Sequence, residues 1–215
     1  PQLQNLIVVR GKVPSDSVSL STLMEKMTLT EATANYLAKF KPSPDDVARL
    51  APTGGTTGLS KLVPRTHNSD LCKVYYGARA YEGGFGDVML AVAPLVHDIN
   101  YLFIFCNWAL FGNKIVICPS TKAKDILQQI ERERVTQCVM VPTLLSDIVK
   151  EPNLDKYDLS SLSRVICGGA HLPAELAKNA MGRLKIYVHN GYGSTEGVTL
   201  ITRSYDSLEV VYSSV

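Results

Sequence analysis

A regular alternation of short apolar runs and amphipathic stretches constrains the fold of this 215-residue chain more than any other feature. From residue 87 onward the pattern predicts strand, helix, strand, helix, four or five times over. Continuous apolar strands, each followed by an amphipathic helix, are typical of a largely parallel sheet with helices on both faces. We therefore predict an α/β fold.

The bounds of the core elements follow from the same pattern. Strands are expected at residues 87–95, 114–119, 137–142, 163–169 and 185–193, and helices at 99–111, 123–135, 143–151 and 173–181. An earlier strand, residues 47–53, is expected to lead into a loop rich in glycine and threonine, and residues 68–83 have helical character. A turn-rich connector, KPSPDD, precedes them. We expect residues 1–45 to be a lead-in segment and residues 46–215 to be the core.

Composition excludes several classes of function. The net charge is only +2, and lysine and arginine are scattered, which gives no case for a nucleic-acid or membrane surface. The longest apolar stretch, Ala91 to Gly112, is interrupted by Pro94 and several polar residues, unlike a membrane span. No signal peptide is recognised, and the five scattered cysteines contain no CxxC pair. Reduced, buried thiols in a cytoplasmic protein are therefore expected.

The loop at residues 53–61 has the composition of a phosphate-binding site. Its backbone N–H groups and hydroxyls can form an anion nest, and Lys61 adds a positive charge. It is not a Walker A loop, because two residues separate Gly58 from Lys61. The alternative is a flexible surface loop. The predicted phosphate-binding residues are Thr53, Gly54, Gly55, Thr56, Thr57, Gly58 and Lys61.

Three further segments of unusual composition follow predicted strands. They are His97-Asp98, Gly168-Gly169-Ala170 and the stretch from Gly191 to Glu196. Ligands of parallel sheets collect at the carboxyl ends of the strands. We therefore expect these segments and the Gly/Thr loop to meet at one edge of the sheet and form a single site.

These residues also carry a family resemblance. TGGTTGLSK resembles the phosphate-loop signature of the adenylate-forming superfamily, which includes acyl-CoA synthetases, luciferases and the adenylation domains of peptide synthetases. GYGSTEG resembles the second signature, Y-G-x-[ST]-E, and VICGGAHLP lies between them in the place of a third element. The stretches LVPRTHNS, PLVHD, QIERERVT and DLSSLSRVICGGA most resemble the aryl-acid branch, which includes 2,3-dihydroxybenzoate-AMP ligases of siderophore assembly. The resemblance extends from about Asp45 to the end.

The resemblance implies a ligase that uses ATP and Mg²⁺. It would join an aryl carboxylate, such as 2,3-dihydroxybenzoate or salicylate, to the α-phosphate of ATP and release pyrophosphate. It would then pass the acyl group to a thiol, either coenzyme A or the phosphopantetheine arm of a carrier protein. Two alternatives remain open: a fatty-acyl or coumarate-type CoA ligase, and a non-catalytic nucleotide-binding or scaffold module.

The resemblance also implies roles for the nucleotide-binding residues. The 53–61 loop would hold the β- and γ-phosphates, and Glu196 would help to place Mg²⁺. Tyr192 would offer a face to the adenine, and Thr195 a hydroxyl near the α-phosphate. Gly191, Gly193 and Ser194 complete this segment. The alternatives are a core tyrosine and, for Glu196, a charge at a helix N-terminus.

A second group of residues is implied on the acyl side. Gly168, Gly169 and Ala170 would leave room for a flat ring against the strand end. His97 would lie beside the acyl carboxylate, unless it is only a hydrogen-bonded polar residue. Asp98 replaces the asparagine common in the aryl-acid branch, and an ionised carboxylate only accepts hydrogen bonds, so a ring with a donor is expected. Thr199 would add polarity to this pocket.

Two departures from the family pattern affect these expectations. Ser60 replaces the usual proline of the phosphate loop, which need not alter phosphate binding. The family's ribose-binding aspartate, hinge and small C-terminal domain with its catalytic lysine are not found in these 215 residues. We therefore expect this chain to be part of a longer protein and to be inactive by itself.

Overall fold

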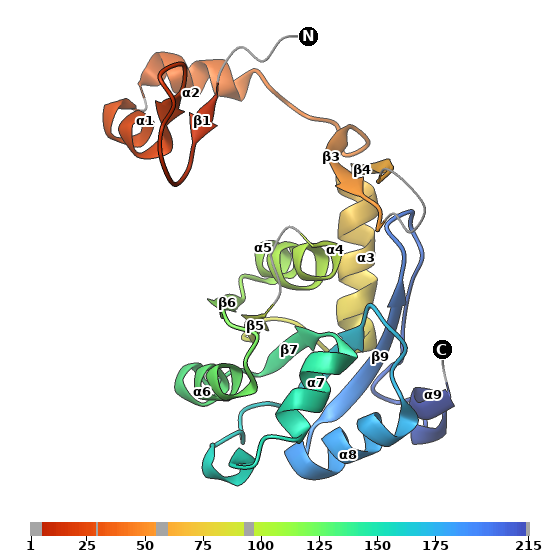
Figure 1. Ribbon diagram of the computed structural model, residues 1–215. Helices are drawn as coiled ribbons and strands as arrows, with labels where there is room; N and C mark the ends of the chain where they lie inside the picture. The colour runs from red at the N-terminus through yellow and green to blue at the C-terminus, as the bar shows by residue number, and fades with distance from the viewer. Residues whose placement is uncertain (1–5, 29, 55–59, 93–96, 214–215) are drawn as a thin grey trace. The chain divides into compact units, whose positions relative to one another are not determined.

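A computed structural model describes residues 6–28, 30–54, 60–92 and 97–213. The chain divides into two compact units, residues 1–43 and 44–215 (Figure 1). In the first, β1 (Ile7–Val8) pairs in parallel with β2 (Val18–Ser19), and α1 (Leu20–Lys26) and α2 (Glu31–Ala38) follow. The Thr30 side chain caps α2 by accepting a hydrogen bond from the Thr33 N–H at 3.2 Å.

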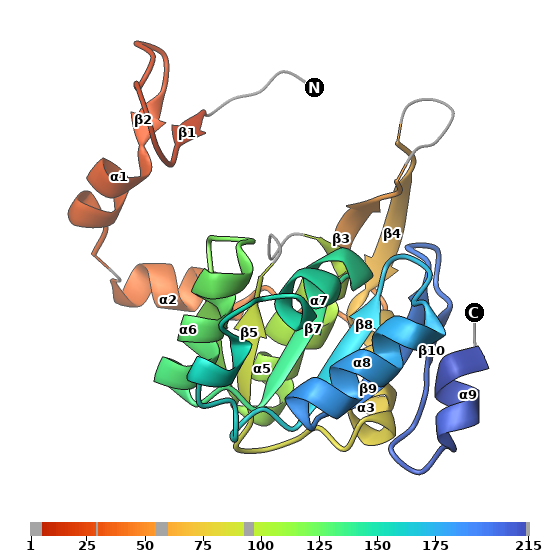
Figure 2. The same ribbon diagram turned by 60° about the horizontal axis from the view of Figure 1, so that its bottom comes forward.

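The second unit is built on a six-stranded sheet with the order β10-β9-β8-β7-β5-β6 (Figure 2). Its strands are β5 (Val88–Ala91), β6 (Lys114–Ile117), β7 (Gln137–Met140), β8 (Arg164–Gly168), β9 (Tyr187–Gly193) and β10 (Thr199–Ile201). The first five of these strands are parallel to their neighbours, and β10 is antiparallel to β9. The largely parallel sheet predicted from the sequence is confirmed.

Helices cover both faces of this sheet, as predicted. One face carries α6 (Ala123–Glu133), α7 (Pro142–Val149) and α8 (Ala174–Leu184) over a core that includes Leu90 and Cys138. The other face packs α3 (His67–Ala80) and the segment that follows β5 against Met89 and Val139. Successive strand residues therefore point to opposite faces, and both faces are apolar because helices bury both.

The predicted helix at 99–111 is a composite of three parts. It begins with a short α4 (Asp98–Asn100), continues as a π-helical segment (Tyr101–Cys106) and ends with α5 (Asn107–Phe111). Gly112 ends it in the left-handed conformation at φ 66°, as the sequence indicated. The π-helical turn was not predicted, and such turns occur frequently at functional sites.

The strand expected before the Gly/Thr loop forms, but it lies outside the main sheet. β3 (Val47–Pro52) does not join the parallel sheet but pairs with β4 (Leu62–Thr66) in a separate antiparallel hairpin, with Pro52 opposite Leu62. The strand that precedes the Gly/Thr loop in the sequence is therefore part of this hairpin and not of the main sheet. Hydrogen bonds between Thr53 and Lys61 continue the pairing of β3 with β4. Four further elements were not predicted from the sequence: β4, β10, the short 3₁₀-helix Leu154–Lys156 and α9 (Leu208–Ser213).

The five cysteines are free thiols: Cys72 is exposed and the other four are buried. Burial raises the pKa of the Cys167 thiol to about 12, which keeps it protonated and unreactive. Within the described ranges, no helix combines the length and apolar character needed to cross a bilayer.

Buried His189 on β9 should make stability depend on pH. Its Nδ1 lies 2.8 Å from the Thr202 carbonyl oxygen, and burial lowers the pKa of the imidazole below its usual value. The unfolded chain therefore binds this proton more readily, so the free energy of unfolding should fall as pH drops below about 6.5. Urea titrations at pH 7.5 and 5.0 should show this loss, and His189→Gln should reduce it.

Exposed His171 provides the matched control, since His171→Gln should leave the pH dependence unchanged. A wild-type and a His189→Gln protein with equal losses between the two pH values would contradict this assignment.

Candidate functional site

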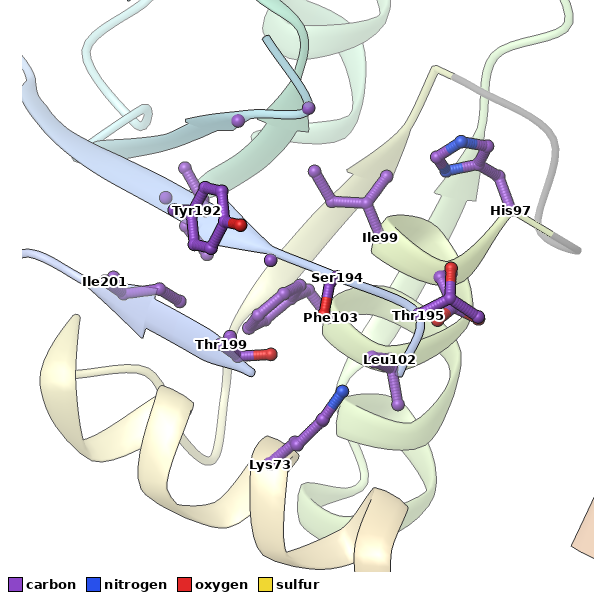
Figure 3. A pocket seen from close by; sticks show the side chains of 16 residues that line it. Lys73, His97, Ile99, Leu102, Phe103, Tyr192, Ser194, Thr195, Thr199 and Ile201 are labelled. Carbon is purple, nitrogen blue, oxygen red and sulfur yellow. The ribbon is translucent and has the colours of Figure 1, made fainter. Parts of the chain in front are cut away.

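A pocket of about 130 Å³ opens at the carboxyl ends of β8 and β9 (Figure 3). The residues that line it come from α3, from the segment after β5, from the two strand ends and from β10. They are Lys73, His97, Asp98, Ile99, Leu102, Phe103, Ile166, Gly168, Gly169, Gly191, Tyr192, Gly193, Ser194, Thr195, Thr199 and Ile201.

The walls of the pocket are mostly apolar. Phe103 and Leu102 come from the π-helical segment, Ile166 from β8 and Ile201 from β10. Leu102, Phe103 and Ile166 belong to the core cluster that packs against α3, so packing fixes their positions. The pocket thus presents rigid apolar walls, which suit a flat hydrophobic group.

Two glycines shape the end of β8. A Cβ atom on Gly168 would lie 2.5 Å from the backbone oxygen of Gly191 on β9, too close for any side chain. Gly169 adopts φ +85°, which favours glycine. The immediate reason for Gly168 is therefore the close approach of β9, a pairing that the sequence analysis did not anticipate.

The segment after β9 forms a tight turn between β9 and β10. The Ser194 N–H donates to the Val198 carbonyl at 2.9 Å, and Gly193 pairs with Thr199. Tyr192 is half exposed at the edge of the pocket, and Thr195 lines it. Glu196 is exposed within the same turn and does not line the pocket.

The described ends of the Gly/Thr loop are tied to each other. The Thr53 N–H donates to the Lys61 carbonyl at 2.9 Å, and the Lys61 N–H donates to Thr53 Oγ1 at 3.1 Å. Neither residue lines the pocket, and the Lys61 side chain is exposed. The predicted phosphate ligands Gly55, Thr56, Thr57 and Gly58 lie outside the described residues.

A network of charges lies against one side of the pocket. Asp70 on α3 accepts from Arg49 Nε at 2.7 Å and from Arg65 Nε at 3.1 Å. Arg49 Nη1 also donates to Asp98 Oδ1 at 2.5 Å, and its guanidinium lies 4.4 Å from the centre of the Tyr101 ring. Burial lowers the pKa of Arg49, but the hydrogen bonds to Asp70 and Asp98 and their negative charges raise it by more. The pKa of Arg49 therefore lies above its usual value. One oxygen of Asp98 is therefore already engaged.

The structure brings together residues from three of the four predicted segments, all except the Gly/Thr loop. His97, Asp98, Gly168, Gly169, Gly191, Tyr192, Gly193, Ser194, Thr195 and Thr199 all line the pocket. Thr53, Gly54, Lys61, Ala170 and Glu196 do not. Sequence reasoning missed Lys73, the apolar walls and the arginine network. Of these, only Lys73 could have been suspected from the local sequence, because it lies three residues after Asp70 on the same helix and so on the same helix face.

The described residues contain no group of three or more histidine, cysteine, aspartate or glutamate side chains placed to hold a metal ion. A dedicated protein cage for a metal is therefore absent from that part of the chain. Mg²⁺ often binds through one or two carboxylates together with substrate phosphates, and exposed Glu196 beside Thr195 fits that arrangement.

Comparison with known proteins identifies the family. Residues 2–214 match the family described as AMP-binding enzyme. The chain is 32% identical over 216 residues to a 2-hydroxy-7-methoxy-5-methyl-1-naphthoate–CoA ligase of Streptomyces carzinostaticus, covering 99% of this chain and 39% of that protein. It is 32% identical over 170 residues to a 2,3-dihydroxybenzoate-AMP ligase of Bacillus subtilis (79% and 32%). A 4-coumarate–CoA ligase of Oryza sativa is 36% identical over 176 residues (78% and 30%).

Solved structures give the same fold. The apo structure of MbtA from Mycobacterium smegmatis superimposes with a TM-score of 0.84 at 23% identity, over 97% of this chain and 37% of that one. The chain therefore spans well under half the length of the relatives that it matches. Its fold, its signature segments and the match over nearly its whole length agree: the chain belongs to the family of AMP-binding enzymes.

Proposed function

We propose that the protein containing this chain activates an aromatic carboxylic acid with ATP, forming an aryl adenylate and releasing pyrophosphate, and then transfers the acyl group to a thiol. The observation that carries this proposal is the small apolar pocket at the ends of β8 and β9, between Phe103, Ile166 and Ile201. Its position at the carboxyl ends of parallel strands is the usual one for ligands in such sheets.

The size of the pocket favours an aromatic acid over a fatty acid. An apolar cavity of about 150 Å³ is known to hold one benzene ring. The pocket here, at about 130 Å³, is close to that size and is therefore suited to a single ring. The names of the relatives, which act on naphthoate, dihydroxybenzoate and coumarate, support the same class.

Several chemical requirements of this reaction have a candidate residue in this chain. Thr53 and Lys61 would contact the β- and γ-phosphates, and Glu196 would hold Mg²⁺, which neutralises phosphate charge when bound. Tyr192 would pack on the adenine, and Thr195 would donate to the α-phosphate. His97, which lines the pocket, would orient the reacting carboxylate and so contribute by positioning.

The acyl acceptor is proposed to be a thiol, either coenzyme A or the phosphopantetheine arm of a carrier protein. The relatives include both CoA ligases and an AMP ligase, so their names support the first step more strongly than either acceptor. Product analysis with each thiol, after the adenylate has formed, distinguishes the two.

Carboxylate-dependent ATP–pyrophosphate exchange tests the proposal. It should be measured with the longest natural polypeptide that contains this sequence, over benzoate, salicylate, 2,3-dihydroxybenzoate, 4-coumarate and palmitate. We expect exchange with benzoate, salicylate or 2,3-dihydroxybenzoate and little with palmitate. Preference for 4-coumarate would indicate the coumarate-type alternative, and no exchange with any acid would favour a non-catalytic nucleotide-binding module.

A further inference from the structure

Lys73 is a charged group in the acyl pocket for which the proposed reaction has no use. It lies on α3, is half buried and lines the cavity together with Leu102, Phe103 and Thr199. Figure 3 shows its ammonium group pointing into the cavity, well away from His97. Removing even part of a cation from water among apolar walls costs free energy, unless an anion or a hydrogen-bond acceptor lies beside it.

The described residues give Lys73 no ion-pair partner. The nearby carboxylates, Asp70 and Asp98, are both engaged by arginines: Asp70 by Arg49 and Arg65, and Asp98 by Arg49. The three cations of this cluster, Arg49, Arg65 and Lys73, outnumber its two carboxylates, which leaves one positive charge beside the pocket.

The electrostatic surroundings of Lys73 agree with this count. Burial lowers the pKa of Lys73 below its usual value, and Arg65 lowers it further, while Asp98 and Asp70 oppose the shift. An anion bound in the cavity would offset both the burial and the repulsion. A lysine ammonium has three donors and no acceptor, so it selects an acceptor on the ligand.

We propose that Lys73 makes the pocket selective for aromatic acids that carry a second oxygen group, a carboxylate or a ring hydroxyl, on the side of the ring remote from the reacting carboxylate. This inference rests on the proposed function and names its substrate class. Thr199, which also lines the cavity, supplies a second hydroxyl for the same group. The Asp98 carboxylate, already bound by Arg49, is a weaker determinant than the sequence alone suggested.

Selectivity can be measured by ATP–pyrophosphate exchange with matched acids, using the longest natural polypeptide that contains this sequence. Isophthalate and 3-hydroxybenzoate carry the second oxygen group, and 3-methylbenzoate replaces it with a methyl group. The wild type should prefer the oxygen-bearing acids by about tenfold to hundredfold in kcat/KM, the range of a hydrogen bond to a charged group. Lys73→Met keeps the length of the side chain and should abolish that preference, mainly by raising KM for isophthalate and 3-hydroxybenzoate relative to KM for 3-methylbenzoate.

Two further variants make the test specific. Lys73→Arg should retain most of the preference, and Lys124→Met, at an exposed position on α6, should behave as the wild type. If Lys73→Met does not fold, Lys73→Gln, which keeps a neutral donor, should still lose preference for isophthalate. An unchanged preference in folded Lys73→Met or Lys73→Gln would overturn the inference alone, whereas absence of exchange with any acid in the wild type would overturn the proposed function.

Discussion

Gly168→Ala should reduce ATP–pyrophosphate exchange by about a hundredfold, because displacement of reacting groups by about 1 Å can have an effect of that size. The new methyl group would lie 2.5 Å from the Gly191 oxygen, so the ends of β8 and β9 must separate. That movement shifts Gly169 on one strand and Tyr192 on the other. Overpacking of this kind should also lower the free energy of unfolding by about 1–3 kcal/mol.

Gly182→Ala provides the matched control for this substitution. Gly182 lies in α8, is exposed, and a Cβ atom there would meet nothing within 4 Å. Alanine should therefore stabilise the helix by up to about 1 kcal/mol and leave exchange unchanged. Urea unfolding and the exchange assay measure both effects. Normal exchange in Gly168→Ala would contradict the role given to the two strand ends.

Asp70→Asn should cause the largest loss of stability, about 3–5 kcal/mol, the range for breaking a buried ion pair on one side. The side chains of Asp70 and Arg65 are both only 6% exposed, and that of Arg49 is 16% exposed. Asparagine would leave two guanidinium groups buried with too little negative charge. Because Arg49 also holds Asp98 and lies over Tyr101, the pocket wall should loosen as well.

The control for Asp70→Asn is a surface ion pair. Asp158 pairs with Arg134 at 2.7 Å, and both side chains are more than half exposed. Solvent screens such a pair, so Asp158→Asn should change the urea midpoint very little. Equal midpoints for the two variants would show that the Arg49–Asp70–Arg65 network contributes no more than a surface pair does.

The alternation of strands and helices was predictable because each element of a parallel sheet must bury its own apolar pattern. The short apolar runs at 114–117, 137–140 and 164–168 could bury both faces only as parallel strands under helices. Gly112 likewise marked the end of its helix by local chemistry. These features depend on residues that are close together in the sequence, so they can be predicted from the sequence pattern.

The features that were missed depend on distant partners. The β3–β4 hairpin places Pro64 opposite Leu50, and no local signal shows whether such a strand joins the main sheet. The arginine network joins Arg49 to residues 21 and 49 positions away. The need for glycine at position 168 comes from a backbone oxygen 23 residues later in the chain, at Gly191. Packing in three dimensions creates all of these constraints.

Which residues line the pocket was therefore easier to predict than the size of the pocket. His97-Asp98, Gly168-Gly169 and Gly191 to Thr195 came together because they lie at or after the carboxyl ends of parallel strands, which meet at one edge of the sheet. The pocket's size and its cation came from Phe103 and Lys73, whose positions depend on the π-helical turn and on α3. The proposed substrate class thus depends on features that only the folded structure displays.

The central claim is that this pocket accepts one aromatic ring as the acyl group of an adenylate. The most direct test is the ratio of ATP–pyrophosphate exchange supported by single-ring acids to that supported by palmitate, at equal subsaturating concentrations. The account predicts rapid exchange with at least one hydroxybenzoate or benzenedicarboxylate and almost none with palmitate. Exchange that is faster with palmitate than with every aromatic acid would contradict it.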